Sequence, residues 1–236
     1  MDDTELIDRS GRGLTIRATG HHAASARPFL QAVFQATDEL CAAMTGGGGG
    51  AAQLLSADQF RPIVAATCAQ TRDIGSPGHR VRALMETLYR EVAGLRADLL
   101  WRGTHAEGIV ASWQGHRLSL SAAGRCQACL VRADTRRILR SADTLAHLDV
   151  VTRVLGAGDL PGAPQSLDLQ PGDRLWLLCH AARTDEDVLR AIAASGPDCE
   201  RVWQSLRAVA SRRPEFDRRA VVALLTVSVG SEGSAR

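Results

Sequence analysis

The segment that most constrains the fold is a turn followed by an apolar run near residue 175. Pro, Gly and Asp at positions 171–173 lead into the stretch Arg174–Cys179, and the chain continues with His180, Ala181 and Ala182. Consecutive proline and glycine are typical of a tight turn. The short apolar run after it is typical of a strand. The sequence therefore predicts a turn at 171–173 and a strand from Arg174 to Cys179.

Length and charge limit the function classes. The chain has 236 residues, 45% of them hydrophobic, and a net charge of +2. This length supports one core, so we predict a single domain over residues 1–236. The small net charge gives no dominant field for nucleic acid or an anionic membrane.

The polar N-terminus, MDDTELIDRSGRG, has no apolar signal region, and the run Ala220–Val229 is too short to span a membrane. We therefore expect a cytoplasmic protein.

The first half of the chain predicts short strands and then two helices. The second helix carries Val81, Leu84, Met85 and Leu88 at spacings of three and four, which is typical of an amphipathic helix on a core. The predicted elements are strands Leu14–Ala18, Ala32–Ala36 and Glu39–Met44, a glycine run Gly46–Gly50, and helices Ala51–Thr71 and Arg80–Leu99.

The second half predicts a run of strands, two helices and a last strand. Turn residues at Gln114-Gly115 and at Ala133–Thr135 separate four short strands, which indicates an antiparallel meander. The predicted strands are Gly108–Trp113, His116–Ala122, Cys126–Arg132, Arg136–Arg140, Arg174–Cys179 and Ala220–Val229, and the predicted helices are Leu145–Leu155, Thr184–Ile192 and Cys199–Ser211.

This order of elements indicates the fold class. Runs of strands alternate with long helices, and there is no regular alternation of single strands and helices. The pattern favours an α+β sandwich over a parallel doubly wound sheet.

The cysteines predict no metal site. Cys126 and Cys129 have the spacing of a zinc or redox pair, but they lie in a predicted strand, where residues three apart face opposite sides. His180 beside Cys179 has no second pair to complete a zinc site. We expect buried thiols.

Several segments together resemble the PPM-type (type 2C) metal-dependent Ser/Thr protein phosphatases. In that family a Pro-Gly-Asp turn leads into a strand that ends in Cys-Ser-Asp-Gly. HRLSLSAAGRCQACLVR resembles its strand, Gly-Asp-Ser-Arg and strand block, with Gly124 kept and Arg125 at the aspartate. VVTRVLG at 150–156 is similar to its Thr-Arg-Ala-Leu-Gly segment, and Asp217-Arg218 falls where Asp-Asn precedes the last strand. The resemblance implies two stacked antiparallel β-sheets flanked by helix pairs, an α-β-β-α sandwich.

The resemblance extends less clearly toward the N-terminus. The family's Asp-Gly turn between a strand and a helix would fall on Met44 and Thr45, and its Arg-x-x-Asn-Glu-Asp segment on Arg27–Ala32. The glycine run after Thr45 fits a flexible loop or, from its place before a helix, a phosphate cradle.

The resemblance also implies a degenerate site. The family holds two Mg²⁺ or Mn²⁺ ions mainly through aspartates, which supply both ligands and charge. Of the matched positions only Asp217 keeps a carboxylate. The other degenerate metal-site positions are Met44, Thr45, Arg125, Ala181 and Arg218. We therefore expect an inactive pseudophosphatase without a metal cofactor, which acts as a binding or regulatory protein.

The residues leave alternatives open for what such a protein binds. Arg125, His180, Arg183 and Arg218 could together accept a phosphate group on a partner protein, or could be exposed loop residues. A second possibility is an active Mn²⁺- or Mg²⁺-dependent Ser/Thr phosphatase with displaced ligands. The carboxylates close enough to the glycine run for that role are Asp38, Glu39 and Asp58. A third is a structural or oligomerising scaffold.

Overall fold

The structure of the protein is a computed structural model. It describes residues 7–11, 14–22, 32–37, 39–48, 57–96, 104–124, 126–132, 135–140, 144–145, 150–151, 153–179, 192, 201, 204–205 and 221–229.

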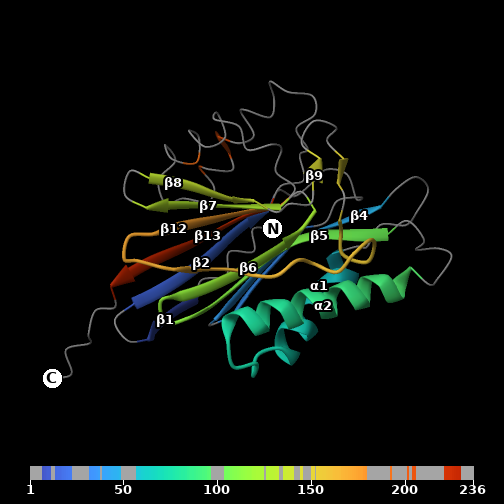
Figure 1. Cartoon of the computed structure of the whole chain (residues 1–236), viewed down its shortest axis with the longest axis horizontal. Helices are drawn as coiled ribbons and strands as arrows, with labels where there is room; N and C mark the ends of the chain where they lie inside the picture. The colour runs from blue at the N-terminus through green and yellow to red at the C-terminus, as the bar shows by residue number, and fades with distance from the viewer. Residues whose placement is uncertain are drawn as a thin grey trace.

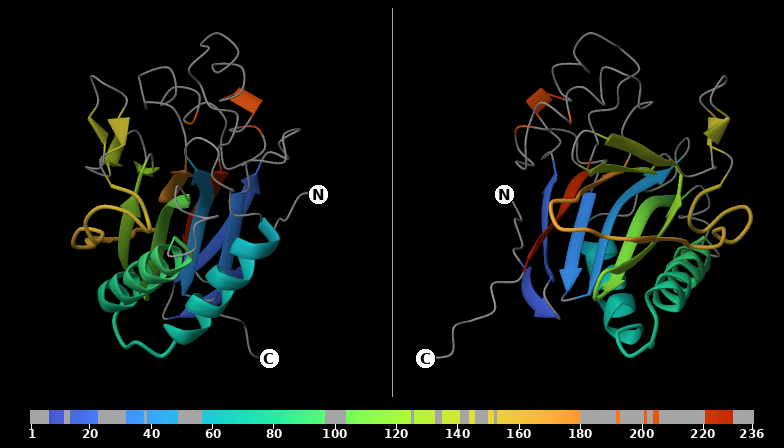
Figure 2. Two further views of the ribbon diagram at one scale, coloured as in Figure 1. Left: turned by 90° about the vertical axis from the view of Figure 1, so that its right-hand side faces the viewer. Right: turned by 60° about the vertical axis from the view of Figure 1, so that its left-hand side comes forward.

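Most of the described strands form two stacked antiparallel sheets (Figures 1 and 2), and two short strands form a separate pair. The first sheet has the order β1 (Ile7–Gly11), β2 (Leu14–His22), β13 (Val221–Val229), β12 (Arg174–Cys179), β7 (Cys126–Arg132), β8 (Thr135–Arg140). The second has the order β11 (Gln165–Asp168), β6 (Arg117–Ala123), β5 (Thr104–Gln114), β4 (Leu40–Gly48), β3 (Ala32–Thr37). The predicted α+β sandwich of stacked antiparallel sheets is confirmed.

One hydrophobic core lies between the sheets. Alternate residues of β5, β6, β7 and β12 point into it, as the period of two requires. Its buried members are Ile109, Ala111, Trp113, Leu118, Leu120, Cys126, Ala128, Leu130, Leu139, Leu169, Leu175 and Leu177.

A second core lies between the second sheet and two helices, α1 (Ala57–Gln70) and α2 (Pro77–Leu95) (Figure 1). Ser76 caps α2, because its Oγ accepts a hydrogen bond from the backbone N–H of His79 at 3.4 Å, and Pro77 follows at the first helical position. Leu84 and Leu88 of α2 are fully buried in this core. Burying each leucine contributes about 1.5–3 kcal/mol. The amphipathic helix predicted from residue spacing is confirmed.

The outer face of the first sheet is also buried. Trp176 and Leu178 alternate with Leu175 and Leu177 along β12 and are fully buried. Ile192 is helical and fully buried. The predicted helices Thr184–Ile192 and Cys199–Ser211 otherwise lie mostly outside the described residues; positions 201 and 204–205 are helical.

The Pro-Gly-Asp turn joins β11 of one sheet to β12 of the other. Gln170 O accepts a hydrogen bond from Asp173 N at 3.0 Å, and Gly172 has φ +85°, which suits a type II turn with proline before glycine. The buried Asp173 carboxylate accepts from Arg132 Nε at 2.8 Å, from Arg132 Nη2 at 2.7 Å and from Gln170 N at 2.8 Å. The hydrogen bond to Asp173 raises the pKa of Arg132 above its ordinary value. A bidentate ion pair therefore fixes this turn.

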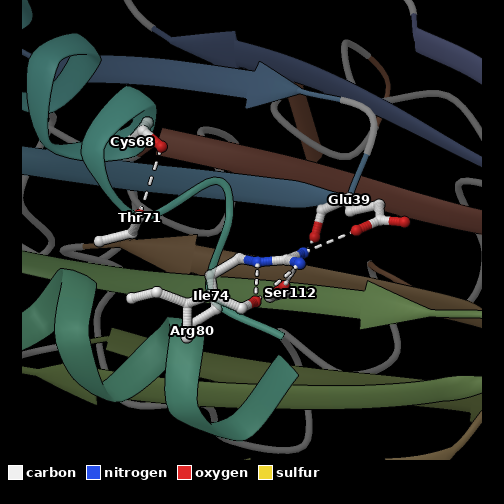
Figure 3. Close-up of polar contacts among 6 residues, drawn as sticks. All are labelled: Glu39, Cys68, Thr71, Ile74, Arg80 and Ser112. Atoms are coloured by element: carbon white, nitrogen blue, oxygen red, sulfur yellow. Dashed lines mark hydrogen bonds and ion pairs between the residues drawn. The ribbon is translucent and has the colours of Figure 1, made fainter. Parts of the chain in front are cut away.

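A second ion pair, between a buried arginine and a half-exposed glutamate, ties α2 to the same end of the sandwich (Figure 3). Arg80, 5% exposed, donates to Glu39 Oε2 at 2.9 Å and to Ser112 Oγ at 3.1 Å, while its Nε and Nη2 donate to Ile74 O. Ser112 Oγ in turn donates to Glu39 O at 2.8 Å. We call this region, with the turn at 170–173, the turn end.

Two sequence predictions are wrong between residues 108 and 155. The expected helix Leu145–Leu155 is instead a strand pair, β9 (Thr144–Leu145) with β10 (Val150–Val151), followed by extended residues in which Leu155 pairs with Ala106. β-Branched residues at 150–152 and 154 favour extended backbone, which outweighed the apolar spacing. Gly156, at φ +87°, then packs on Val92, where a Cβ would lie 2.5 Å from Cγ1.

The expected four-stranded meander is divided between the sheets. β5 pairs with β6 in the second sheet, and β7 pairs with β8 in the first. The link after Gly124 crosses between the layers, which sequence spacing alone does not reveal. The hairpin turn lies at Gly115 and His116, one residue later than predicted, because Gly115 supplies the positive φ of +58°.

Other predicted strand boundaries differ from those in the structure, but the fold class is the predicted one. β4 continues through the first three glycines to Gly48, so that part of the run is strand and not loop. β1 and β11 were not predicted, since five- and four-residue polar strands carry little apolar signal. Among the described helices, none is long and apolar enough to cross a membrane.

Candidate functional site

Strand ends from both sheets meet at the end of the sandwich opposite the turn end. β6 ends at Ala123 and β7 begins at Cys126, so the crossing between the sheets takes two residues. Cys126 pairs with Cys179, the last residue of β12, and Cys179 pairs with Val221, the first residue of β13. We call this region the loop end.

In the second sheet, β4 carries Met44 and Thr45, the two positions aligned with the family's Asp-Gly, to the loop end as well. Met44 is the register partner of Gly108 on β5, and Gly108 is the partner of Ala123. Thr45 is paired with Glu107. The backbones of Met44 and Thr45 therefore lie two strands away from the crossing after Ala123. That these positions correspond to the family's Asp-Gly stays a prediction.

Glu107 is a loop-end carboxylate that the sequence analysis did not single out. It is only 4% exposed. It shares the strand face of Ile109 and Ala111, which point into the core between the sheets. Its side chain therefore enters that core at the loop end. A glutamate within an otherwise apolar strand, followed by Gly108, was the available signal.

Gly124 gives this carboxylate its space. At Gly124, φ is +84°, and a Cβ there would lie 2.5 Å from Cγ and 2.8 Å from Cδ of Glu107. Contacts this short do not occur between real side chains, so only glycine fits between the strand end and the glutamate. The glycine kept from the family-like block is thus required by packing in this chain.

Most of the predicted site residues lie outside the described part of the structure. These are Arg125, His180, Ala181, Arg183, Asp217 and Arg218. Arg125 and His180 directly follow described residues of the loop end, Gly124 and Cys179. That the arginines and His180 converge there stays a prediction.

Glu39, one of the carboxylates considered as displaced ligands, does not reach the loop end. Glu39 accepts from Arg80 at the turn end, at the opposite end of β4 from Thr45 (Figure 3). Asp58 lies in α1, on the helical layer, and Asp38 is outside the described residues. The suggestion that Glu39 supplies a ligand is therefore wrong, because its side chain is bound to a buried guanidinium.

The Cys126–Cys129 pair behaves as predicted. Cys126 belongs to the core between the sheets, whereas Cys129 is buried but not part of that core. Cys68, Cys126 and Cys129 are buried and form no disulfide. The two strand sulfurs therefore do not form a zinc or redox pair.

The described loop-end residues do not fit two divalent ions. Hard cations of this size take several oxygen ligands, mainly carboxylates. Among the residues that the structure describes, no three His, Cys, Asp or Glu side chains are grouped to hold a metal ion. In the described part of the chain, Glu107 is the carboxylate that lies where β4, β5 and β6 reach the loop end. One carboxylate is too few.

Comparison with known proteins places the fold. A scan against protein-family models gives no match, and a search of curated proteins gives no significant match. Among solved structures, the chain is similar to the serine/threonine phosphatase PstP/Ppp of Mycobacterium tuberculosis, with 19% identity and a TM-score of 0.69 over 92% of this chain and 99% of that one.

Two further structures agree. The catalytic domain of PstP in complex with two manganese ions gives 19% identity and a TM-score of 0.69, over 91% of this chain and 99% of that one. The PPM Ser-Thr phosphatase MsPP of Mycobacterium smegmatis gives 17% identity and a TM-score of 0.61, over 90% and 98%. The chain therefore has the PPM phosphatase fold along almost its whole length.

Proposed function

We propose that the chain is a PPM-fold pseudophosphatase, which acts by binding a partner protein and does not hydrolyse phosphoesters. The observation that carries the proposal is which residues β4 places at the loop end. Met44 and Thr45 lie there, paired with Gly108 and Glu107, at the positions that match the family's metal-binding Asp-Gly.

The charge at the matched positions supports this proposal. Ala181 has no side-chain oxygen, and Arg218 puts a positive charge beside Asp217, the one matched carboxylate. A single carboxylate next to an arginine is a poor ligand set for Mn²⁺ or Mg²⁺. The PstP domain with the same fold binds two manganese ions. This chain would work without a metal cofactor.

The partner in this proposal is a protein that carries a phosphate group. Guanidinium groups match phosphate oxygens directly and need no bridging cation. Arg125, His180, Arg183 and Arg218 are the residues that would bind it, and each follows or precedes a strand that ends at the loop end. The protein would act in the cytoplasm as a regulatory binding module.

A second candidate is an active metal-dependent phosphatase with displaced ligands. The specific observation in its favour is Glu107, a buried carboxylate at the loop end that the sequence comparison did not count. Asp217 and Glu107 together would give such a site two carboxylates.

Hydrolysis of a generic aryl phosphate separates the two candidates. At millimolar Mn²⁺ or Mg²⁺, the purified full-length protein is expected to show no turnover above background. Mn²⁺ and chelators are expected to leave the melting temperature unchanged, because an ion that binds the native state would raise it by mass action. Metal-dependent turnover that disappears in Asp217→Ala or Glu107→Gln would establish the active enzyme instead.

Binding of inorganic phosphate tests the positive part of the proposal. Calorimetry at low salt is expected to show binding that weakens as salt increases, because the contact is electrostatic. Combining Arg125→Ala with Arg218→Ala should abolish it. Binding that is indifferent to these substitutions would leave the scaffold interpretation.

A further inference from the structure

Two cysteines lie directly opposite each other where neighbouring strands of the first sheet reach the loop end. Cys126 is the first residue of β7, Cys179 is the last residue of β12, and the antiparallel register pairs them. Directly opposite residues of an antiparallel pair share one face of the sheet. Cys126 and Cys129, in contrast, are three positions apart on one strand and belong to opposite faces.

The shared face is the one that borders the core between the sheets. Cys126 belongs to this core and is 1% exposed. Leu175 and Leu177 of β12 also belong to it. Cys179 follows them at the next step of two along the strand, so its position continues the series that borders the core.

The backbone geometry of such a pair matches that of a disulfide. Opposite residues of an antiparallel ladder have Cα atoms about 4.5 or 5.5 Å apart, depending on whether the two residues exchange hydrogen bonds. A disulfide joins residues whose Cα atoms are about 4.4–6.8 Å apart. Both kinds of pair fall within this range, so neither strand has to shift for a bond to form.

The register does not offer the other described cysteines such a pair. Cys129 is the register partner of Trp176 on β12 and of Ile138 on β8. Cys41 is the register partner of two alanines, one on β3 and one on β5. Cys68 lies in α1 and belongs to the core between the second sheet and the helices. In the described part of the chain, the register therefore singles out Cys126 and Cys179.

We infer that Cys126 and Cys179 are a redox-sensitive pair, which a peroxide oxidises to a cross-strand disulfide at the loop end. The thiolate of one cysteine attacks a peroxide oxygen and breaks the O–O bond, which gives a sulfenic acid. The sulfur of the second cysteine then attacks the sulfenic sulfur, so that an S–S bond forms and the S–O bond breaks. Two thiols and one hydrogen peroxide give one disulfide and two water molecules, which take up both thiol protons.

The place of the pair determines what the bond would do. Burial slows the reaction of a thiol, but both cysteines are terminal in their strands, so fraying of two strand ends admits the oxidant without opening the sheet. The bond would join the chain where it enters β7 to the chain where it leaves β12. Oxidation would thus link the two chain segments that adjoin the first sheet at the loop end. This inference goes beyond the proposed function and does not depend on it.

Peptide mapping of the full-length protein tests the bond. The native protein is treated with hydrogen peroxide, alkylated in denaturant and digested with trypsin without reduction. Because trypsin cleaves after arginine, Cys126 falls in the peptide 126–132 and Cys179 in the peptide 175–183. These two peptides should be joined, and dithiothreitol should separate them. Absence of the joined peptides overturns the inference.

The control is Cys129→Ala, because Cys129 lies in the same peptide as Cys126 and is equally buried. The yield of joined peptides should be unchanged in Cys129→Ala and should fall at least tenfold in Cys126→Ala, with near-ultraviolet circular dichroism as the check of native packing. Equal yields in the two variants overturn the assignment to Cys126.

The stability of the wild type shows whether the bond fits the native fold, and this measurement needs no variant. A disulfide removes conformational freedom from the unfolded chain, so the oxidised protein should have an equilibrium constant of unfolding in urea at least tenfold smaller than the reduced protein. The reduced reference is the same peroxide-treated sample after dithiothreitol, so that any oxidised methionines are common to both. An oxidised form that is no more stable than this reference would overturn a cross-strand bond in the native sheet.

Discussion

The turn end and the loop end of the sandwich both bury a carboxylate, but they hold it in different ways. At the turn end, Asp173 receives three hydrogen bonds from Arg132 and Gln170 within 2.8 Å. At the loop end, the buried Glu107 side chain packs against Gly124, where a Cβ would lie 2.5 Å from its Cγ. The first arrangement stabilises a turn between the sheets. The second depends on a glycine that leaves room for the glutamate.

This difference separates the contacts that stabilise the fold from the residues of the loop end. The Pro-Gly-Asp turn and its ion pair connect β11 to β12 across the two sheets and involve no loop-end residue. A substitution at the loop end leaves these contacts intact. Fold stability and site chemistry are therefore separable in this architecture.

The largest expected effect comes from breaking the ion pair of the turn end. Asp173→Ala removes the acceptor of Arg132 and of Gln170 N, and it should lower the free energy of unfolding by about 3 kcal/mol, because one partner of a buried pair is lost. Urea unfolding measures it.

Asp168→Ala provides the control for this prediction. The Asp168 side chain is 74% exposed, and only its backbone oxygen accepts from Arg132, so the substitution should change stability by less than about 0.5 kcal/mol. Equal losses of unfolding free energy in the two variants would show that the hydrogen bonds of Asp173 do not stabilise the turn.

Substituting two glycines with nearly the same backbone conformation, one at each end, compares how much stability each end loses when a Cβ is added. Gly124 has φ +84° and Gly172 has φ +85°, but a Cβ meets Glu107 at the first and open space at the second. Gly172→Ala should cost about 1 kcal/mol from the left-handed backbone alone. Gly124→Ala should cost about 1 kcal/mol more, because the loop end must also move Glu107.

The excess at Gly124 should depend on Glu107. Shortening the side chain by Glu107→Ala removes the Cγ and Cδ atoms that a new Cβ would meet, so the extra loss should largely disappear in Gly124→Ala/Glu107→Ala. Urea unfolding of the four variants measures this coupling. Equal costs for the two glycine substitutions would contradict the close packing.

Sequence patterns predicted the sheets where burial dictates them. The strands Cys126–Arg132 and Arg174–Cys179 have the predicted bounds, because their apolar residues are buried within the sandwich. The helix predicted over Leu145–Leu155 failed because short-range apolar spacing competes with the extended preference of Val150, Val151 and Val154. The division of four strands between two sheets depends on a long-range contact that no local pattern contains.

The site was predicted only as far as the family-like segments extend. The backbones of Met44 and Thr45 lie at the loop end, and their match to the family's Asp-Gly stays a prediction. Glu107 was missed because its position matches no metal-binding residue of the family, and its importance comes from burial and from Gly124. Glu39 was considered a ligand from its place near the glycine run, but the antiparallel course of β4 carries it to the opposite end.

The smallest expected effect concerns Cys68 of α1. This helix belongs to the helical layer that Arg80 of α2 connects to the turn end. Burial raises the pKa of the Cys68 thiol in α1 from 9.0 to about 12. The unfolded chain therefore loses this proton first as the pH rises, so the thiol's contribution to stability is complete below pH 9 and is lost between pH 9 and 12. The chain has no lysine and one tyrosine, and its other five cysteines are common to the wild type and Cys68→Ala, so the difference between these two proteins reports Cys68. Between pH 9 and 10 the wild type should lose about 1 kcal/mol more than Cys68→Ala. Urea unfolding at each pH gives the two slopes, and parallel slopes would show that Cys68 is not isolated from water in the folded protein.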